Sequence, residues 1–397
     1  MRSSKEIMEQ TEKYGAHNYK PKEVVFSQAD GIMVKNPEGE VFYDMLSAYS
    51  ALNFGHKHPE LVQAAKDQLD TLSLSSRAFY NEKLGEWMEK LCKFTGKSMV
   101  LPMNTGAEAV ETALKTARRW GHLVKGVEEG KQEIICCKNN FHGRTITIIS
   151  MSNDDDARLG FGPFAPGFKS VEYGNLEELE AAITPNTVAF IMEPIQGEAG
   201  VIIPPAGFMK KAYEVCKKNN VLLIADEVQT GFARTGNMFA SQFEEVEPDI
   251  YILGKALGGG IIAVSAVAAN EDILGVYTPG SHGSTFGGNP LGCAVSIKAM
   301  EILERDNYPQ QAKEKGDYFM SKLREIKNDE IVEVRGRGLL IGMEFSVNAA
   351  PYVKKLIKGG VLAKETHEKT IRFAPPIVST YEQLDAALAI IKEALTK

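Results

Sequence analysis

Cysteine is scarce in this sequence and never occurs at the spacing of a disulfide framework or a metal site. The 397 residues include five cysteines, without a CxxC motif, and seven histidines, without an HExxH pair. Zinc sites and small disulfide-stabilised folds depend on such spacings, so we expect no metal and no disulfides. The thiols are predicted to be reduced and mostly buried, as is usual in the cytoplasm.

Long apolar runs are missing as well. The longest, Ala256–Ala269, has 14 residues and is interrupted by three glycines and Ser265, whereas a membrane-spanning helix needs roughly 20 apolar residues. The first 15 residues are charged throughout and contain no apolar signal segment. We therefore expect a cytoplasmic protein that does not interact with a membrane.

A surplus of basic residues is also absent. Lys and Arg number 45 against 52 Asp and Glu, which gives a formal charge of −7. Nucleic acid binding depends on clustered positive charge, so nucleic acid is not an expected partner. The remaining composition is that of a globular protein, with 44% hydrophobic residues and a length of roughly two to three typical domains.

Short apolar runs rich in β-branched residues alternate with helical patterns in the middle of the chain. Four such runs are EIICC, TVAFIM, VLLIA and DIYIL, at 133–137, 187–192, 221–225 and 249–253. Between the second and third runs, apolar residues of 208–220 repeat at helical spacing, as in a βαβ unit. Continuous apolar strands are typical of a parallel sheet buried on both faces. The sequence therefore predicts an α/β core.

The ends of the chain differ from this core. GIMVKN and VFYDM, within the first 50 residues, have strand patterns around the turn PEGE. After residue 297 the patterns predict an α+β unit, with a helix at 310–327, strands at 331–335, 339–345 and 370–373, and a helix from Tyr381 capped by Thr380 and Gln383. We predict three segments, namely an N-terminal segment 1–49 that packs on the small domain, a large domain 50–296 and a C-terminal small domain 297–397.

One further helix is predicted between the N-terminal strands and the core. Leu61, Ala65, Leu69 and Leu72 recur at helical spacing after Pro59, which is well placed in a first turn. We expect all four side chains to face the core, because an apolar stripe is usually a packing face.

Charged side chains closely follow three of the buried runs. TVAFIM leads into Glu193, VLLIA into Asp226, and DIYIL into Lys255 after one glycine. In a parallel sheet these carboxyl ends meet at one edge, where ligands bind. A single charge there is often only a helix cap or a surface group. Asp226 and Lys255 together indicate a site.

Two stretches are suited to bind an anion. An apolar strand turns through NTG at 104–106 into a helix whose start has a capping box of Thr105 and Glu108. The amides of such a helix start suit phosphate if the Glu108 carboxylate points away, and a plainly capped helix is the alternative. The loop HGSTFGGNP at 282–290 adds the hydroxyl of Thr285. No GxGxxG fingerprint follows a strand, which argues against a dinucleotide enzyme.

A phosphate cradle, a carboxylate and an amine at strand ends are together what pyridoxal phosphate needs. The strings LPMNTGAEAVETALK, FHGRT, EPIQGEAGV, IADEVQTGFARTG, ILGKALGGG, HGSTFGGNPLGCA, RGRGLL and IRFAPPIV resemble, in order and spacing, the class-III pyridoxal-phosphate aminotransferases of fold type I. The resemblance covers nearly the whole chain. It implies a large domain with a mostly parallel seven-stranded sheet flanked by helices, and a smaller α+β domain.

The resemblance assigns seven residues to the cofactor, which are Gly106, Ala107, Phe141, Asp226, Gln229, Lys255 and Thr285. Lys255 would bind the cofactor covalently and Asp226 would pair with the ring nitrogen. Phe141 would stack on the ring and Gln229 would bond its hydroxyl side. The amides of Gly106 and Ala107, joined by Thr285 from the neighbouring subunit, would hold the phosphate. This last role implies an obligate homodimer.

Five further residues are assigned to substrates, namely Tyr19, Tyr49, Arg144, Glu198 and Arg372. Arg144 and Arg372 would bind carboxylates, and Glu198 would mask Arg372 in the first half-reaction. The tyrosine pair would hold the α-amino end of ornithine. The resemblance thus implies ping-pong transfer of the δ-amino group of L-ornithine to 2-oxoglutarate, with acetylornithine or 4-aminobutyrate as the alternative donor.

Two positions depart from the family pattern. Ala263 stands where a proline is common after the lysine loop, and His142 stands where animal ornithine enzymes resemble a tryptophan version. Neither changes the expected reaction class. An aminomutase, a decarboxylase or a non-catalytic cofactor-binding protein on the same fold also stays open, and dependence on an added keto acid separates a transaminase from the first two.

Overall fold

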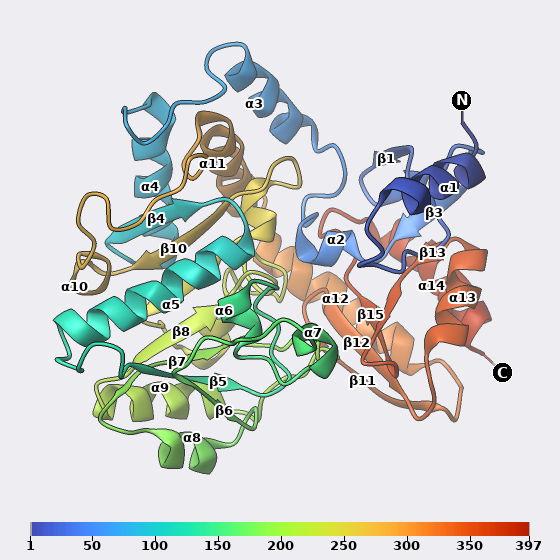
Figure 1. The fold of residues 1–397 in the computed structure, drawn as a ribbon. Coiled ribbons are helices and arrows are strands. Elements are labelled where there is room, and N and C mark those ends of the chain that lie inside the picture. Colours follow the sequence, from blue (N-terminus) through green and yellow to red (C-terminus); the bar gives the residue numbers. More distant parts are fainter. Residues whose placement is uncertain (1, 397) are drawn as a thin grey trace.

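A seven-stranded, mostly parallel sheet forms the centre of the larger part of the molecule (Figure 1). The computed structural model describes residues 2–396, so Met1 and Lys397, the outer ends of two predicted segments, lie outside it. The strand order is β4-β10-β9-β8-β7-β5-β6, and β10 is antiparallel to both of its neighbours. The strands are β4 Met99–Met103, β5 Glu133–Cys137, β6 Phe168–Val171, β7 Thr187–Met192, β8 Leu222–Asp226, β9 Ile250–Leu253 and β10 Ser265–Ala269.

Both faces of this sheet are covered by helices. All six residues of β7 and all five of β8 are buried, as their continuous apolar runs predict. Helix α5 (Gly106–Leu123) packs on one face, and α9 (Phe208–Lys218) connects β7 to the parallel strand β8 across the other. The predicted α/β sheet and its βαβ unit are confirmed.

Two four-stranded sheets form the smaller part of the molecule. One has the order β11-β12-β15-β14, and in the other β1, β2 and β3 continue into β13 of the C-terminal region. The N-terminal strands thus share a sheet with a strand of the C-terminal region. The three segments 1–49, 50–296 and 297–397 stay a prediction. The strands are β1 Gln28–Asp30, β2 Met33–Lys35, β3 Val41–Asp44, β11 Ile331–Arg337, β12 Leu340–Phe345, β13 Val361–Leu362, β14 Lys364–Thr366 and β15 Thr370–Phe373.

Helices cover the small domain and join the two parts. The predicted capping box of Thr380 and Gln383 opens the last helix, α14. The other helices not yet given are α1 Ser4–Tyr14, α2 Ser47–Ser50, α3 Pro59–Leu69, α4 Glu82–Thr95, α6 Ile146–Ile149, α7 Asp155–Arg158, α8 Leu176–Ala182, α10 Glu271–Leu274, α11 Pro290–Arg305, α12 Tyr308–Arg324, α13 Ala350–Gly359 and α14 Tyr381–Leu395, with 3-10 turns at Ala240–Glu244 and Lys255–Gly258.

The prediction for α3 is wrong in its last turn. The helix begins at Pro59 as expected but ends at Leu69, so Leu72 lies beyond it. Leu69 and Leu72 are 55% and 42% exposed on this chain. The Gln68 side chain donates a hydrogen bond to the Leu72 carbonyl, and this local bond competes with continuation of the helix.

A buried arginine ties the two parts together. Arg234 is fully buried and donates to Asn53 and to the carbonyl oxygens of Leu339 and Pro375. Four of the five cysteines are buried and all are unpaired, as predicted. Within residues 2–396 there is no cluster of metal-ligating side chains and no helix long and apolar enough to span a membrane.

Candidate active site

The carboxyl ends of β7, β8 and β9 bring three charged side chains to one edge of the sheet. Asp226 is the last residue of β8, Glu193 follows β7 directly, and Lys255 follows β9 after Gly254. Lys255 lines a cavity of about 730 Å³. Its φ of +47° places it in the left-handed region, a strained conformation that is typical of functional sites. The convergence inferred from the sequence pattern is present.

The Lys255 amine titrates below its usual range. Burial lowers its pKa to about 8, with Arg372 acting in the same direction and Glu198 and Asp226 opposing it. A neutral amine is therefore accessible near neutral pH. Such an amine is suited both to attack a carbonyl and to carry a proton.

Asp226 is backed by a histidine that sequence reasoning did not pair with it. His142 Nδ1 lies 2.6 Å from Asp226 Oδ2, and both side chains are buried. Burial alone would lower the pKa of His142, but its hydrogen bond and charge interaction with Asp226 raise it overall. His142 Nε2 has no partner among the described residues. An anionic Asp226 held by His142 can keep a ring nitrogen protonated.

Glu193 is a second buried carboxyl at this edge. The Phe141 N–H donates to Glu193 Oε2 at 3.1 Å, which fixes the backbone next to His142. Burial raises the pKa of Glu193 to about 7, with Asp226 and Glu198 adding to the effect. Its place at a strand end was visible in the sequence, whereas its contact with Phe141 was not.

The start of α5 presents two free amides. The Glu108 carboxylate turns back to accept the N–H groups of Asn104 and Thr105, so it does not occupy the helix axis. Within the described chain, the N–H groups of Gly106 and Ala107 have no acceptor. A Cβ on Gly106 would lie 3.1 Å from Val228 Cγ1, so the close approach suits glycine. This helix start has the geometry of a phosphate site.

These observations fit pyridoxal phosphate. A poorly solvated amine, a carboxylate backed by a histidine and two unsatisfied helix amides are the three groups its aldehyde, ring nitrogen and phosphate require. The Phe141 ring lines the Lys255 cavity and is 37% exposed, so a face is open for stacking. The donor set therefore matches the expected cofactor.

Arg372, which is buried, forms an ion pair with the partly buried Glu198 beside this site. Arg372 Nη1 lies 2.5 Å from Glu198 Oε1 and 3.2 Å from Gln229 Oε1, and Gln229 Nε2 donates to the same Glu198 oxygen. Burial alone would raise the pKa of Glu198, but the charges of Arg372 and Lys255 lower it overall. A Cβ on Gly197 would lie 1.9 Å from Gln229 Oε1, so this glycine makes room for the network. Arg372 is covered by Glu198.

The remaining predicted residues are divided between two cavities. Tyr19, Tyr49, Phe141 and Arg144 line the cavity of Lys255. The Arg372 guanidinium lies 5.0 Å from the centre of the Tyr49 ring. Ala107 and Thr285 instead line a neighbouring cavity of about 440 Å³ within the same chain.

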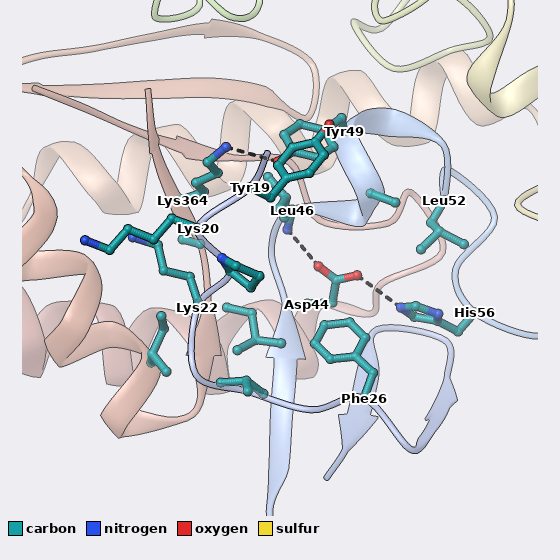
Figure 2. Close-up of a pocket in the computed structure, with 16 residues that line it drawn as sticks. Tyr19, Lys20, Lys22, Phe26, Asp44, Leu46, Tyr49, Leu52, His56 and Lys364 are labelled. Carbon is teal, nitrogen blue, oxygen red and sulfur yellow. Dashed lines mark hydrogen bonds and ion pairs between the residues drawn. The ribbon is translucent and has the colours of Figure 1, made fainter. Parts of the chain in front are cut away.

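Sequence reasoning also missed Lys364, on β14. Its Nζ donates to the Tyr49 hydroxyl at 3.1 Å (Figure 2). Its side chain also lines the cavity of Lys255. The motif IRFAPPIV marks the neighbouring strand β15, where Arg372 lies opposite Lys364. The signal available in the sequence was that Lys364 is a cationic residue close to Arg372, which was itself predicted to bind a carboxylate.

Comparison with known proteins agrees with this geometry. The family pattern described as aminotransferase class-III matches residues 14–395. The ornithine aminotransferase of Brevibacillus brevis is 61% identical over 389 residues, 98% of each chain, and that of a Geobacillus species is 59% identical over 99% of each.

Solved structures agree as well. The ornithine aminotransferase of Toxoplasma gondii has a TM-score of 0.98 at 40% identity, covering 100% of this chain and 95% of that one. The acetylornithine aminotransferase of Elizabethkingia anophelis has a TM-score of 0.91 at 45% identity, covering 100% and 99%. A second Toxoplasma structure has pyridoxal phosphate at partial occupancy in its active site. This chain belongs to the class-III aminotransferase family.

Proposed function

We propose that this protein is an ornithine aminotransferase that transfers the δ-amino group of L-ornithine to 2-oxoglutarate. The products are glutamate and glutamate 5-semialdehyde, which cyclises to pyrroline-5-carboxylate. The observation that carries the proposal is the ion pair of Glu198 with the buried Arg372 beside Lys255. Curated relatives named ornithine aminotransferase, 56–61% identical over nearly the full length, support it.

The enzyme uses pyridoxal 5'-phosphate, which supplies an electron sink and carries the amino group between the two substrates. Lys255 would hold its aldehyde carbon, and Asp226, backed by His142, its ring nitrogen. The free amides of Gly106 and Ala107 would hold the phosphate. Phe141 would cover one face of the ring, and Gln229 would reach its hydroxyl side.

Lys255 is the group that moves protons. With a pKa of about 8, its amine is partly neutral near neutral pH. It can therefore take a proton from the δ-carbon of ornithine and would pass it to the cofactor in the first half-reaction; in the second it would deliver a proton to the α-carbon that becomes that of glutamate. The charges of Asp226 and Glu198 keep the protonated form accessible as well, so one residue can serve in both directions.

The charged groups around the cavity would select the reacting amine. Arg144 would bind the α-carboxylate of ornithine through its guanidinium, a geometry suited to carboxylates. Tyr19 and Tyr49 would hold the α-amino end. Because Glu198 occupies Arg372, the α-carboxylate cannot bind there and present the wrong amine. For 2-oxoglutarate, Glu198 would move away and free Arg372.

The runner-up function is acetylornithine aminotransferase. The solved structure of that name is 45% identical to this chain, more than the 40% of the Toxoplasma ornithine enzyme. Tyr49 favours ornithine, because a bulky side chain that is hydrogen-bonded to Lys364 narrows the cavity. An acetyl group on the α-amine would have to fit against this ring.

The chain is also proposed to act as a cytoplasmic homodimer in which Thr285 reaches the phosphate of the neighbouring subunit. Several large apolar side chains are exposed on the single chain, including Phe79, Tyr80, Phe161 and Phe286. Exposed apolar groups of this kind are typical of subunit interfaces. The unpaired cysteines favour a reducing compartment.

A single-turnover measurement tests the function. Cofactor-loaded protein is mixed with L-ornithine, N-acetylornithine or 4-aminobutyrate without keto acid, and the cofactor absorbance and the products are followed. A rapid change in cofactor absorbance with ornithine, together with formation of the δ-aldehyde, supports the proposal. Preference for another amine would leave the family and Lys255 in place but overturn the substrate. Lys255→Ala is the inert control, expected to fold and not to turn over.

A further inference from the structure

A second cavity lies on the other side of the substrate-cavity wall. Its volume is about 510 Å³, within the range of sites for small organic ligands. Four residues, Tyr19, Ala48, Tyr49 and Lys364, line both cavities. Figure 2 shows Tyr19 beside Tyr49, and Lys364 bonded to the Tyr49 hydroxyl. Any occupant of the second cavity would therefore touch the residues expected to hold ornithine.

The lining is apolar on most sides. Its large apolar side chains come from the N-terminal segment, from the loop after β3 and from the C-terminal region, and they are Val24, Phe26, Leu46, Leu52, Ile357 and Leu362. A hydrocarbon chain or ring would be removed from water along these surfaces, at about 25 cal/mol per Å² of apolar area. The body of a ligand for this cavity is therefore apolar.

Positive charge gathers on one side of the same cavity. Lys20, Lys22 and Lys364 lie there (Figure 2). Lys22 is paired with Glu365 at 2.5 Å. Within residues 2–396, neither Lys20 nor Lys364 has a carboxylate partner, and Lys364 bonds only the Tyr49 hydroxyl. The Lys20 ammonium therefore has no competing anion, and the Lys364 ammonium has only the Tyr49 hydroxyl to give up when it binds one.

The single acid of the lining does not neutralise this charge. Asp44 Oδ1 accepts the N–H groups of Leu46 and Ser47, each at 2.9 Å, and its Oδ2 lies 3.0 Å from His56 Nε2. Its side chain is only 4% exposed. The carboxylate is thus committed to the wall of the cavity and is not turned toward the lysines.

The shared wall is a strained element. Ser47, Ala48, Tyr49 and Ser50 all have positive φ, from 45° to 74°, so α2 is a left-handed turn without glycine. Such backbone costs roughly 1–2 kcal/mol per residue and persists only where surrounding contacts impose it. Lys364 provides one of these contacts at Tyr49, and it faces both cavities.

We propose that this second cavity binds a carboxylate that carries an apolar chain or ring, and that Lys364 links its occupancy to Tyr49. The carboxylate pairs with Lys20 and Lys364, and the apolar body fills the cavity. Drawing the Lys364 ammonium toward the ligand weakens its bond to the Tyr49 hydroxyl. Binding itself is independent of the proposed function, whereas the effect on ornithine rests on it.

Titration calorimetry of the cofactor-loaded enzyme with octanoate tests the binding step. We expect one octanoate per chain and no heat from octylamine, which has the same tail and the opposite charge. Lys20→Met, which lies outside the substrate cavity, should weaken octanoate binding about tenfold or more. Lys35→Met is the matched control and should change nothing, because Lys35 is an exposed lysine on β2 that does not line the cavity.

Three results would overturn the proposed site. They are no octanoate binding up to its solubility limit, binding that Lys20→Met leaves unchanged, and binding that is lost in Arg144→Met. The last result would place octanoate in the substrate cavity instead. Val24→Phe, which fills the apolar side of the second cavity, should weaken octanoate binding in parallel with Lys20→Met.

Steady-state kinetics test the link to ornithine. Octanoate should raise the KM for ornithine about two- to tenfold, the range expected for one weakened hydrogen bond, with little change in kcat. Tyr49→Phe removes the hydroxyl. In this variant the KM for ornithine should therefore be nearly the same with and without octanoate. If octanoate raises the KM for ornithine by the same factor in Tyr49→Phe and in the unchanged enzyme, Lys364 does not link the second cavity to Tyr49. If ornithine is not a substrate, the calorimetry still decides the site.

Discussion

Glu198 and Arg372 lie in surroundings where neither charge can be left without a partner. The Arg372 side chain is 2% exposed and that of Glu198 26%. Removing Glu198 therefore leaves a poorly solvated guanidinium that will take the best available anion, which in an amino acid is the α-carboxylate. For Glu198→Ala we expect the ratio of α- to δ-transamination of ornithine to rise about tenfold or more, given charge-assisted hydrogen bonds of about 1.5–3 kcal/mol.

Mass spectrometry of the products formed from ornithine and 2-oxoglutarate measures this ratio. Glu172→Ala is the control, because Glu172 forms an ion pair with Lys138 on the surface, far along the chain from the network. Its product ratio should match that of the unchanged enzyme. A product ratio in Glu198→Ala that also stays the same would show that Glu198 does not mask Arg372.

Glu193 makes the stability of the fold depend on pH. Its pKa is raised from 4.5 to about 7, so between these values the folded protein keeps a proton that the unfolded chain releases. The contribution of Glu193 to the free energy of unfolding is therefore highest below pH 4.5 and falls as the pH rises to 7. Glu193→Gln has no proton to lose. As the pH rises from 4.5 to 7, the free energy of unfolding of Glu193→Gln should therefore increase relative to that of the unchanged protein, by up to about 3 kcal/mol.

Urea titrations at several pH values between 4.5 and 8 give the required free energies of unfolding. Glu333→Gln is the matched control, since Glu333 is 56% exposed and pairs with Arg335 at the surface. It should show the same pH dependence as the unchanged protein. A constant difference between Glu193→Gln and the unchanged protein across the range would remove Glu193 as the source of the effect.

The convergence of Asp226 and Lys255 could be predicted from the sequence, whereas the hydrogen bonds around them could not. Asp226 and Lys255 were identified because strand ends converge in a parallel sheet, a rule that needs only the order of apolar runs. The bond between His142 and Asp226 joins positions 84 apart, and that between Lys364 and Tyr49 joins positions 315 apart. Such pairs depend on how strands and loops pack in three dimensions. No local pattern encodes them.

Among the elements, the left-handed turn α2 is the least expected from sequence. The tetrapeptide SAYS contains no glycine or asparagine, the residues that normally mark this conformation. Its backbone is imposed from outside, by the Asp44 carboxylate at its start and by Lys364 at Tyr49. The strands, in contrast, follow their own composition. Their β-branched apolar runs fix both type and burial, which is why the sheet was predicted and this turn was not.

Replacing Asp44 tests what holds this turn. Asp44→Ala leaves the N–H groups of Leu46 and Ser47 without acceptors and removes the partner of His56. Unsatisfied buried donors cost about 1–3 kcal/mol each, so we expect a loss of roughly 2–4 kcal/mol in the free energy of unfolding. The KM for ornithine should rise as well, because Tyr49 loses its fixed position.

Asp30→Ala provides the comparison for this change. Asp30 is 83% exposed and lies 3.4 Å from Lys57, a surface pair worth little. Thermal unfolding and steady-state kinetics of both variants can be measured side by side. If Asp44→Ala unfolds at the same temperature as Asp30→Ala, the turn is held by other contacts.

For the whole molecule, the important feature is that the site lies where separate parts meet. Glu198 and Lys255 lie in the connections that follow β7 and β9 of the large sheet, whereas Arg372 and Lys364 lie on β15 and β14 of the C-terminal sheet. Arg234 fixes these parts to one another through two carbonyl oxygens and Asn53, and burial lowers its pKa to about 9. The residues proposed for the substrates thus come from both parts of the molecule, whereas those proposed for the cofactor in the same chain come from the large sheet and its loops.

A second copy of the chain is proposed to complete the phosphate site. Thr285 lines a cavity with Ala107 of its own chain, separate from the cavity of Lys255, so its proposed action on the phosphate of the neighbouring subunit needs a direct test. Hybrid dimers test this. One subunit carries Lys255→Ala and the other Thr285→Ala, with different affinity tags so that the hybrid can be isolated.

The two arrangements give opposite results in this hybrid. If Thr285 acts across the interface, one site combines both changes and the other has none, because the intact Lys255 meets the intact Thr285. The hybrid should then bind cofactor at one site with the affinity of the unchanged enzyme and turn over at about half its rate. If Thr285 acts within its own chain, every site carries one change. The hybrid would then show, even at its working site, the weakened cofactor binding of Thr285→Ala, and the proposed exchange of Thr285 between subunits would be wrong.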